Sequence, residues 1–210
     1  MNSTYIQETA PFFGLSRLRI GRDGPGVTTL AAFCGCPLKC RYCLNPLCHE
    51  TGGKHCVHLS PQELYDRIKI DNLYFRATGG GVPFGGGEPG MYSGFIARFR
   101  DLCGPRWKLN VETSLHIPPE CLEELATVTN LFIVDVKDLN PDIYRRYTGA
   151  DVTPVIRNLE RLHALGRADD THIRVPHIPG YNTPHDVART RTRLRELGFG
   201  KVEEFTYRIR

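Results

Sequence analysis

Short apolar runs recur along the chain, with amphipathic stretches between them. The runs that predict strands are Val27–Phe33, Val82–Phe84, Lys108–Thr113, Leu131–Asp135, His172–Val175 and Val202–Tyr207. The helical patterns are Pro61–Ile68, Met91–Leu102, Pro119–Ala126, Pro141–Tyr147, Pro154–Leu165 and Pro184–Leu197. Several of these begin with proline, whose missing N–H costs nothing in the first turn of a helix. This alternation predicts parallel strands joined by crossover helices.

About six β/α units fit into the 210 residues. A full barrel needs eight units and roughly 250 residues, so an open partial (β/α)6 barrel or a doubly wound sheet is expected. Both architectures place function at the carboxyl ends of the strands. No repeat, low-complexity tract or linker divides the sequence. We therefore expect a single domain over residues 1–210, with Leu44–Ser60 as a loop within it.

Composition narrows the class of protein. Hydrophobic residues make up 40% of the chain and charged residues 24%, which is ordinary for a globular domain. The net charge of +4 is too small to indicate a nucleic-acid partner. The opening residues, 1–8, lack a secretion signal, and no run approaches the roughly 20 apolar residues of a membrane span. We therefore expect a cytoplasmic protein, in which the eight cysteines are poor disulfide candidates.

Four of the cysteines are clustered in residues 34–43, which read CGCPLKCRYC. Cys36, Cys40 and Cys43 are separated by three and then two residues, directly after the first predicted strand. Three thiolates on one tight loop can bind three irons of a [4Fe-4S] cluster and leave the fourth iron open to a small molecule.

Two other sites are compatible with these residues. A zinc site would need a fourth ligand, either Cys34 or one of Cys48 and Cys56 with a histidine. A fully ligated electron-transfer cluster would take Cys48 or Cys56 as its fourth ligand. The spacing lacks the second Cys-x-x-Cys pair typical of zinc sites, and this favours the open cluster.

Two stretches around the cysteine triplet resemble a known protein family. Residues 22–28 (RDGPGVT) followed by residues 33–46 (FCGCPLKCRYCLNP) resemble the opening of a radical S-adenosylmethionine (SAM) enzyme. They are most similar to the branch that activates glycyl-radical enzymes, typified by the pyruvate formate-lyase activating enzymes. The similarity runs from about residue 18 to the carboxyl terminus, and it favours the partial barrel.

The resemblance implies that Cys36, Cys40 and Cys43 hold a [4Fe-4S] cluster whose open iron is chelated by the amino and carboxylate groups of SAM. It also implies a cofactor contact for Tyr42, within the triplet. No ferredoxin-type cysteine insert follows Asn45, so we expect one cluster. The cysteines predicted to be free thiols are Cys48, Cys56, Cys103 and Cys121.

Glycines are concentrated in residues 79–89, which read GGGVPFGGGEP. Glycine lets the main chain approach a ligand closely, although such a run is often only a loop. No Gly-Lys-Ser/Thr follows, so phosphate binding is not favoured. Gly86, Gly87 and Glu88 are similar to the second motif of the family, and the resemblance implies that they bind the aminium group of SAM.

Charged residues lie at the ends of two further predicted strands. Asp135 and Lys137 share one face by alternation, an arrangement that is by default a surface ion pair. Residues 135–149 nevertheless resemble the activating-enzyme pattern, which implies that Lys137 meets the SAM carboxylate. Asp135, with Glu112 and Thr113, could then help to bind a monovalent cation, and Arg174 is implied to contact the cofactor.

The resemblance also implies a reaction. A reduced cluster would cleave SAM to methionine and a 5′-deoxyadenosyl radical, which would abstract hydrogen from a glycine in a partner glycyl-radical enzyme. A low-potential donor such as flavodoxin or ferredoxin would supply the electron. Two alternatives stay open, namely a radical SAM enzyme acting on a small molecule or peptide, and a non-catalytic iron–sulfur or zinc protein. No single side chain is assigned as catalytic.

Overall fold

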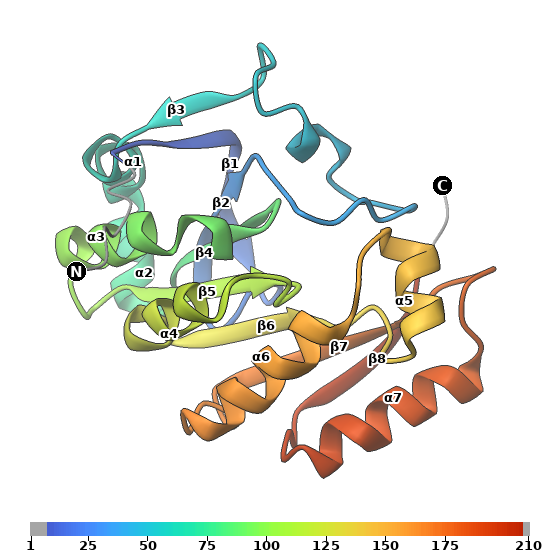
Figure 1. Cartoon of the computed structure of the whole chain (residues 1–210). Coiled ribbons are helices and arrows are strands. Elements are labelled where there is room, and N and C mark those ends of the chain that lie inside the picture. The colour runs from blue at the N-terminus through green and yellow to red at the C-terminus, as the bar shows by residue number, and fades with distance from the viewer. Residues whose placement is uncertain (1–7, 208–210) are drawn as a thin grey trace, which may run out of the picture.

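The computed structural model describes residues 8–207, which form one curved eight-stranded sheet with helices packed against it (Figure 1). The strands are β1 (Ala10–Ile20), β2 (Val27–Phe33), β3 (Val57–Leu59), β4 (Gly81–Gly86), β5 (Lys108–Thr113), β6 (Leu131–Asp135), β7 (Thr171–His177) and β8 (Val202–Thr206). The α-helices are α1 (Pro61–Ile68), α2 (Asn72–Thr78), α3 (Ser93–Cys103), α4 (Pro119–Val128), α5 (Pro141–Thr148), α6 (Thr153–Ala164) and α7 (Pro184–Glu196). Short 3₁₀ turns are η1 (Pro46–His49), η2 (Lys69–Asp71) and η3 (Pro89–Tyr92).

The strand order is β3-β1-β2-β4-β5-β6-β7-β8, and every pairing from β2 to β8 is parallel. The six parallel strands follow one another in chain order, which gives the partial (β/α)6 barrel. A doubly wound sheet would reverse its order at a switch point, and none occurs among these strands. β1 and β3 extend the first edge in antiparallel pairing.

The sheet has two different faces. Phe132 and Val134 of β6 are buried in the hydrophobic core, whereas Leu131, Ile133 and Asp135 alternate with them and line a cavity on the inner face. No helix residue lines that cavity, so the helices cover the outer face and leave the inner face as a concave surface. This alternation follows from the period of two in a strand.

The predicted elements are present, and β2, β5, β6 and α1 have the predicted bounds. Five of the helices carry proline in the first turn, as the sequence indicated. Three elements were not predicted from the sequence, namely β1, β3 and α2. The second half of β1 is largely exposed at the sheet edge, and β3 and α2 have three and seven residues, so none of them carries a strong hydrophobic pattern. No helix in the described part of the chain is long and apolar enough to cross a membrane.

Aromatic residues form the core beneath the end of β2. The ring of Phe33 stacks on that of Tyr92 with centroids 4.7 Å apart and also packs on Phe12. The Tyr92 hydroxyl donates a hydrogen bond to the Cys34 carbonyl at 2.8 Å. This contact fixes the backbone where the chain leaves the sheet toward the cysteine triplet.

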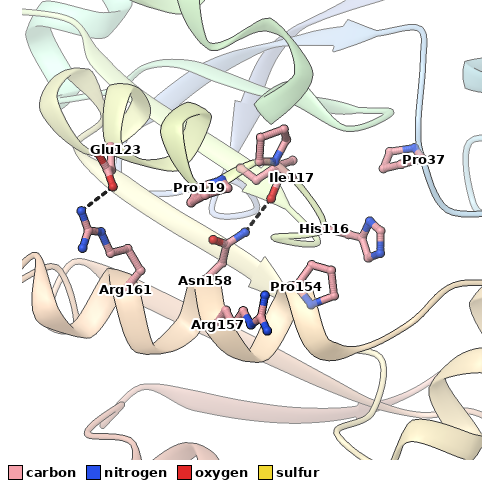
Figure 2. A pocket seen from close by; sticks show the side chains of 10 residues that line it. Pro37, His116, Ile117, Pro119, Glu123, Pro154, Arg157, Asn158 and Arg161 are labelled. Atoms are coloured by element: carbon pink, nitrogen blue, oxygen red, sulfur yellow. Dashed lines mark hydrogen bonds and ion pairs between the residues drawn. The ribbon is translucent and has the colours of Figure 1, made fainter.

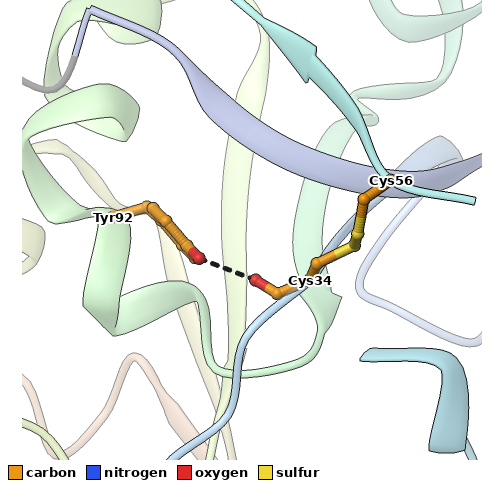
Figure 3. Close-up of a disulfide and its surroundings, with 3 residues drawn as sticks. All are labelled: Cys34, Cys56 and Tyr92. Atoms are coloured by element: carbon orange, nitrogen blue, oxygen red, sulfur yellow. Dashed lines mark hydrogen bonds between the residues drawn. A yellow bond between two sulfur atoms is a disulfide. The ribbon is translucent and has the colours of Figure 1, made fainter. Parts of the chain in front are cut away.

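Cys34 and Cys56 form a disulfide (Figure 3). The predictions that Cys56 is a free thiol and that the cysteines are poor disulfide candidates are therefore wrong. β3 pairs with β1, and Cys34 N donates to Pro11 O of β1 at 2.8 Å, so the returning chain lays Cys56 beside Cys34. Tertiary pairing brings together two residues 22 positions apart in sequence. Cys48, Cys103 and Cys121 are free, as predicted.

Asn158 on α6 joins that helix to the loop after β5 through hydrogen bonds. Its substitution tests this part of the fold. Its buried amide donates to the carbonyls of Leu115 and Ile117 at 2.9 and 2.8 Å, the second of which Figure 2 shows. We expect Asn158→Ala to lower the free energy of unfolding by about 1–3 kcal/mol, because it strands both carbonyls. Urea unfolding of the metal-free protein measures this. The exposed neighbour Arg157→Ala is the control, expected within about 0.5 kcal/mol of wild type; equal stability of both variants would contradict the prediction.

Candidate functional site

The cysteine triplet lies on the loop that leaves the carboxyl end of β2. Cys36, Cys40 and Cys43 line one cavity of about 120 Å³. The loop is held against the end of α5, because Lys39 N donates to Thr148 O at 2.9 Å and Arg41 N donates to Tyr147 O at 3.1 Å. All three thiols are free. The loop therefore presents three ligand atoms to one small space.

The glycine-rich turn at the end of β4 packs directly against this loop. Gly87 N donates to Phe33 O at 2.9 Å, and Glu88 N donates to Gly35 O at 2.8 Å. A Cβ on Gly87 would lie 2.1 Å from Gly35 O, so only glycine fits there. Gly86 has φ +90°, a conformation that favours glycine. Two glycines thus permit the turn to pair with the backbone of the cysteine loop.

The Glu88 carboxylate is buried, and groups of the same chain donate hydrogen bonds to all of its acceptor sites. It accepts hydrogen bonds from Thr113 Oγ1 at 2.6 Å, from the Ser114 hydroxyl at 2.6 Å, and from the backbone N–H groups of Ser114 and Gly90 at 2.8 and 3.1 Å. A carboxylate has about four acceptor sites, and all are used here. Glu88 therefore joins the glycine turn to the end of β5.

Lys137, just after β6, is a buried cation. Its Nζ lies 3.3 Å from Asp135 Oδ2 and donates to the Tyr207 hydroxyl at 3.1 Å. Burial opposes its charge, but Asp135 and Tyr207 outweigh burial and raise the pKa of Lys137 above its usual range, so the ammonium is kept. The second oxygen of Asp135, Oδ1, is buried and has no hydrogen-bond partner among the described residues. The pair thus places a retained positive charge in the wall of the small cavity.

The three triplet thiols differ in their electrostatics. Burial raises the pKa of Cys36 to about 12 and also raises that of Cys40, so a bound metal would have to displace their protons. A hydrogen bond from Cys48 instead lowers the pKa of Cys43 to about 5, with a further contribution from His49. Cys43 is therefore the thiol most ready to bind a metal.

A larger cavity of about 790 Å³ occupies the inner face of the sheet and shares lining residues with the small one, among them Asn45, Glu112 and Asp135. Arg174 lies here, with Nη1 3.4 Å from Glu112 Oε1 and Nη2 donating to Arg22 O at 2.8 Å. Burial and the nearby Asp23 raise the pKa of Glu112 to about 7, against the attraction of Arg174. The small cavity thus adjoins a larger one that is lined by charged side chains.

Most of the predicted site residues converge. The small cavity is lined by Cys36, Cys40, Cys43, Tyr42, Gly86, Gly87, Glu88, Lys137, and the suggested cation ligands Glu112, Thr113 and Asp135. Arg174 lines only the larger cavity. Lining residues that the sequence pattern did not indicate include Ser114, Tyr147 and Tyr207. Ser114 directly follows the predicted Glu112–Thr113 pair and was open to detection, whereas Tyr207 enters only because β8 lies beside β7.

A separate apolar cavity of about 810 Å³ lies on the outer side of the barrel (Figure 2). It is lined by Ile117 and by the four prolines Pro37, Pro118, Pro119 and Pro154, with Arg157 and Arg161 also in its wall. None of the predicted site residues lines it, although Pro37 directly follows Cys36. The chemistry predicted from the sequence therefore lies elsewhere.

Comparison with known proteins identifies the class. Residues 31–194 match the model of the Radical SAM superfamily, and the chain belongs to this superfamily of enzymes. It is 27% identical to the (2S)-3-sulfopropanediol dehydratase activating enzyme of Klebsiella oxytoca, over 81% of this chain and 72% of that protein. It is 30% identical to the pyruvate formate-lyase-activating enzyme of Listeria monocytogenes, over 64% of this chain and 56% of that protein.

The fold agrees with this assignment. The structure of Streptococcus suis SuiB bound to S-adenosylmethionine superposes with a TM-score of 0.60 at 15% identity, covering 82% of this chain but only 37% of SuiB. The superfamily implies a [4Fe-4S] cluster and SAM. The residues fit both groups, because three free thiols, the buried ammonium of Lys137 and the main chain of Gly86 and Gly87 line one cavity.

The charge on Glu112 yields a pH-dependent prediction. Burial raises the pKa of its carboxyl from 4.5 to about 7 on folding, so the unfolded state loses its proton first as pH rises. The wild-type protein therefore loses stability between pH 4.5 and 7 relative to Glu112→Gln. We expect the variant's advantage to be about 2–3 kcal/mol larger at pH 8 than at pH 5. Denaturant unfolding of the metal-free protein at pH 5 and pH 8 measures it, and an equal difference at both values would refute the prediction.

Proposed function

We propose that this protein is an activating enzyme, which cleaves SAM reductively and abstracts a hydrogen atom from a glycine of a partner glycyl-radical enzyme. The observation that carries the proposal is the convergence of three elements on one cavity. The triplet Cys36, Cys40 and Cys43, the turn at Gly86–Glu88 and the ammonium of Lys137 all line it. The relatives described above, which are activating enzymes by name, support the same assignment.

In this proposal the triplet thiolates hold the cluster, which when bound supplies one electron to the sulfonium of SAM. Lys137 faces the SAM carboxylate and keeps its charge through Asp135 and Tyr207. The main chain of Gly86 and Gly87 faces the aminium group, because the Glu88 carboxylate is already fully hydrogen-bonded. Tyr42 borders the same cavity. The chain thereby positions the carbon–sulfur bond and keeps water from the reactive species.

The large inner cavity supports a macromolecular hydrogen donor. It has a volume of about 790 Å³ and shares lining residues with the small cavity. Polar and charged groups of Glu112, Arg174 and Arg22 surround it and can hydrogen-bond a peptide backbone. We propose that a glycine-bearing loop of the partner enters here, that a flavodoxin or ferredoxin supplies the electron, and that these events take place in the cytoplasm.

A small molecule or free peptide is the second candidate for the hydrogen donor. The cavity of about 790 Å³ lies within the usual size range of small-ligand pockets. The ion pair between Arg174 and Glu112 would then select a polar ligand. This function shares the cofactor chemistry and differs only in what loses the hydrogen atom.

Substitution of Lys137 tests whether this residue binds the SAM carboxylate. We expect Lys137→Met to keep its iron content but to bind SAM about ten- to a hundredfold more weakly, because a charge-assisted hydrogen bond of about 1.5–3 kcal/mol is lost. SAM binding is measured anoxically on the reconstituted protein. The control is Lys39→Met, an exposed lysine within the cysteine loop, whose affinity should match wild type. Equal affinity in both variants contradicts the role of Lys137.

The hydrogen donor is tested by electron paramagnetic resonance. The reduced, reconstituted protein with SAM is expected to form 5′-deoxyadenosine and a glycine-centred radical in a glycyl-radical enzyme from the same organism. Cys40→Ala should abolish both products through loss of the cluster, whereas Cys103→Ala should retain them. If 5′-deoxyadenosine forms while every such enzyme stays free of radical and a metabolite or peptide is consumed, the second candidate replaces the first. If no SAM is cleaved although the cluster is loaded, the chain is a non-catalytic iron–sulfur protein.

A further inference from the structure

Cys48 is a buried thiol that the proposed reaction does not use. It lies in η1 with 1% of its surface exposed. Its Sγ, the Sγ of Cys43 and a ring nitrogen of His49 all lie within 4.8 Å of one another. The buried Cys48 thiol therefore lies beside one ligand of the proposed cluster.

The backbone holds Cys48 firmly in this position. Cys48 N donates to Asn45 O at 2.9 Å, and Gly35 N donates to Cys48 O at 2.6 Å. The second bond attaches η1 to the start of the cysteine loop, one residue after Cys34. The Cys34–Cys56 disulfide fixes the far end of the same segment (Figure 3). These hydrogen bonds and the disulfide therefore hold the Cys48 thiol close to the Cys43 sulfur.

We propose that Cys48 is a positioning residue whose S–H donates a hydrogen bond to the Cys43 sulfur and thereby raises the reduction potential of the cluster held by the triplet. This inference rests on the cluster of the proposed function. Reduction adds negative charge to a cluster and its sulfur ligands, and a hydrogen-bond donor stabilises that charge. A thiol is a weak donor, so the effect is that of one modest hydrogen bond.

The chemistry of the neighbours supports a donor role. Cys43 belongs to the triplet with the three-then-two spacing, so it is the metal ligand of the pair and Cys48 is the group left over. His49 is exposed and stands on the outer side of the pair, where an N–H group can donate to sulfur as well. Because Cys48 is buried, water cannot replace it as the hydrogen-bond donor to the Cys43 sulfur.

The test is an anoxic potentiometric titration of the reconstituted protein without SAM or partner, following the reduced cluster by electron paramagnetic resonance. Cys48→Val keeps the bulk of the side chain and removes the donor, whereas Cys48→Ser keeps a donor. At the wild-type midpoint potential, we expect the ratio of reduced to oxidised cluster to fall about tenfold in Cys48→Val, a shift of about 59 mV for one electron. Cys48→Ser should stay within about threefold of wild type. Cys121→Ala, on α4, is the control and should not change.

Three results would overturn the inference. One is an unchanged potential in Cys48→Val, or in Cys48→Ala if valine prevents folding. Another is loss of iron from the Cys48 variants to the level of Cys43→Ala, which would make Cys48 a ligand. The third is stoichiometric zinc held by Cys43, Cys48 and His49 that excludes iron from the triplet. The measurement needs no partner, so a loaded wild-type cluster that never generates a glycyl radical would end the proposed function while leaving this test intact.

Discussion

The site depends on the pairing of two backbones at the carboxyl edge of the sheet. The glycine turn donates from Gly87 and Glu88 to the carbonyls of Phe33 and Gly35, and this contact puts the cysteine loop and the turn in register. A side chain on Gly87 would collide with Gly35 O. Because peptide N–H and C=O groups buried at such an edge must find partners, the two loops fix each other. The small cavity between them is a consequence of this pairing.

Glu88 extends the same constraint to the next strand. Its carboxylate gathers the donors of Thr113 and Ser114 at the end of β5, while its backbone N–H binds the cysteine loop. One residue thus links β2, β4 and β5 at the point where the ligands converge. A buried, fully satisfied carboxylate of this kind rigidifies its surroundings. These hydrogen bonds give Glu88 a structural role, which the family resemblance alone did not indicate.

Charge in the interior is arranged in two levels. Close to the triplet, Lys137 is held by Asp135 and Tyr207, and one Asp135 oxygen is left without a partner among the described residues. Farther along the inner face, Arg174 is engaged with Glu112. The first level lines the cavity that holds the cysteine triplet, whereas Arg174, expected at the cofactor, lines only the wider cavity.

The sequence by itself determined that parallel strands alternate with helices and that three cysteines share one loop, because strand periodicity, proline-initiated helices and a three-then-two spacing are local features. The resemblance of its motifs to a known family then indicated the superfamily and the partial barrel. Positions along one strand also follow from alternation, and this placed Asp135 and Lys137 on one face. The residue pairs that non-local contacts bring together could be identified only from the tertiary structure. The antiparallel pairing of β3 with β1 brings Cys56 to Cys34, β8 delivers Tyr207 to Lys137, and the returning loop lays Cys48 against Cys43. These partners are separated by many residues or by irregular turns, so no periodic pattern could indicate them.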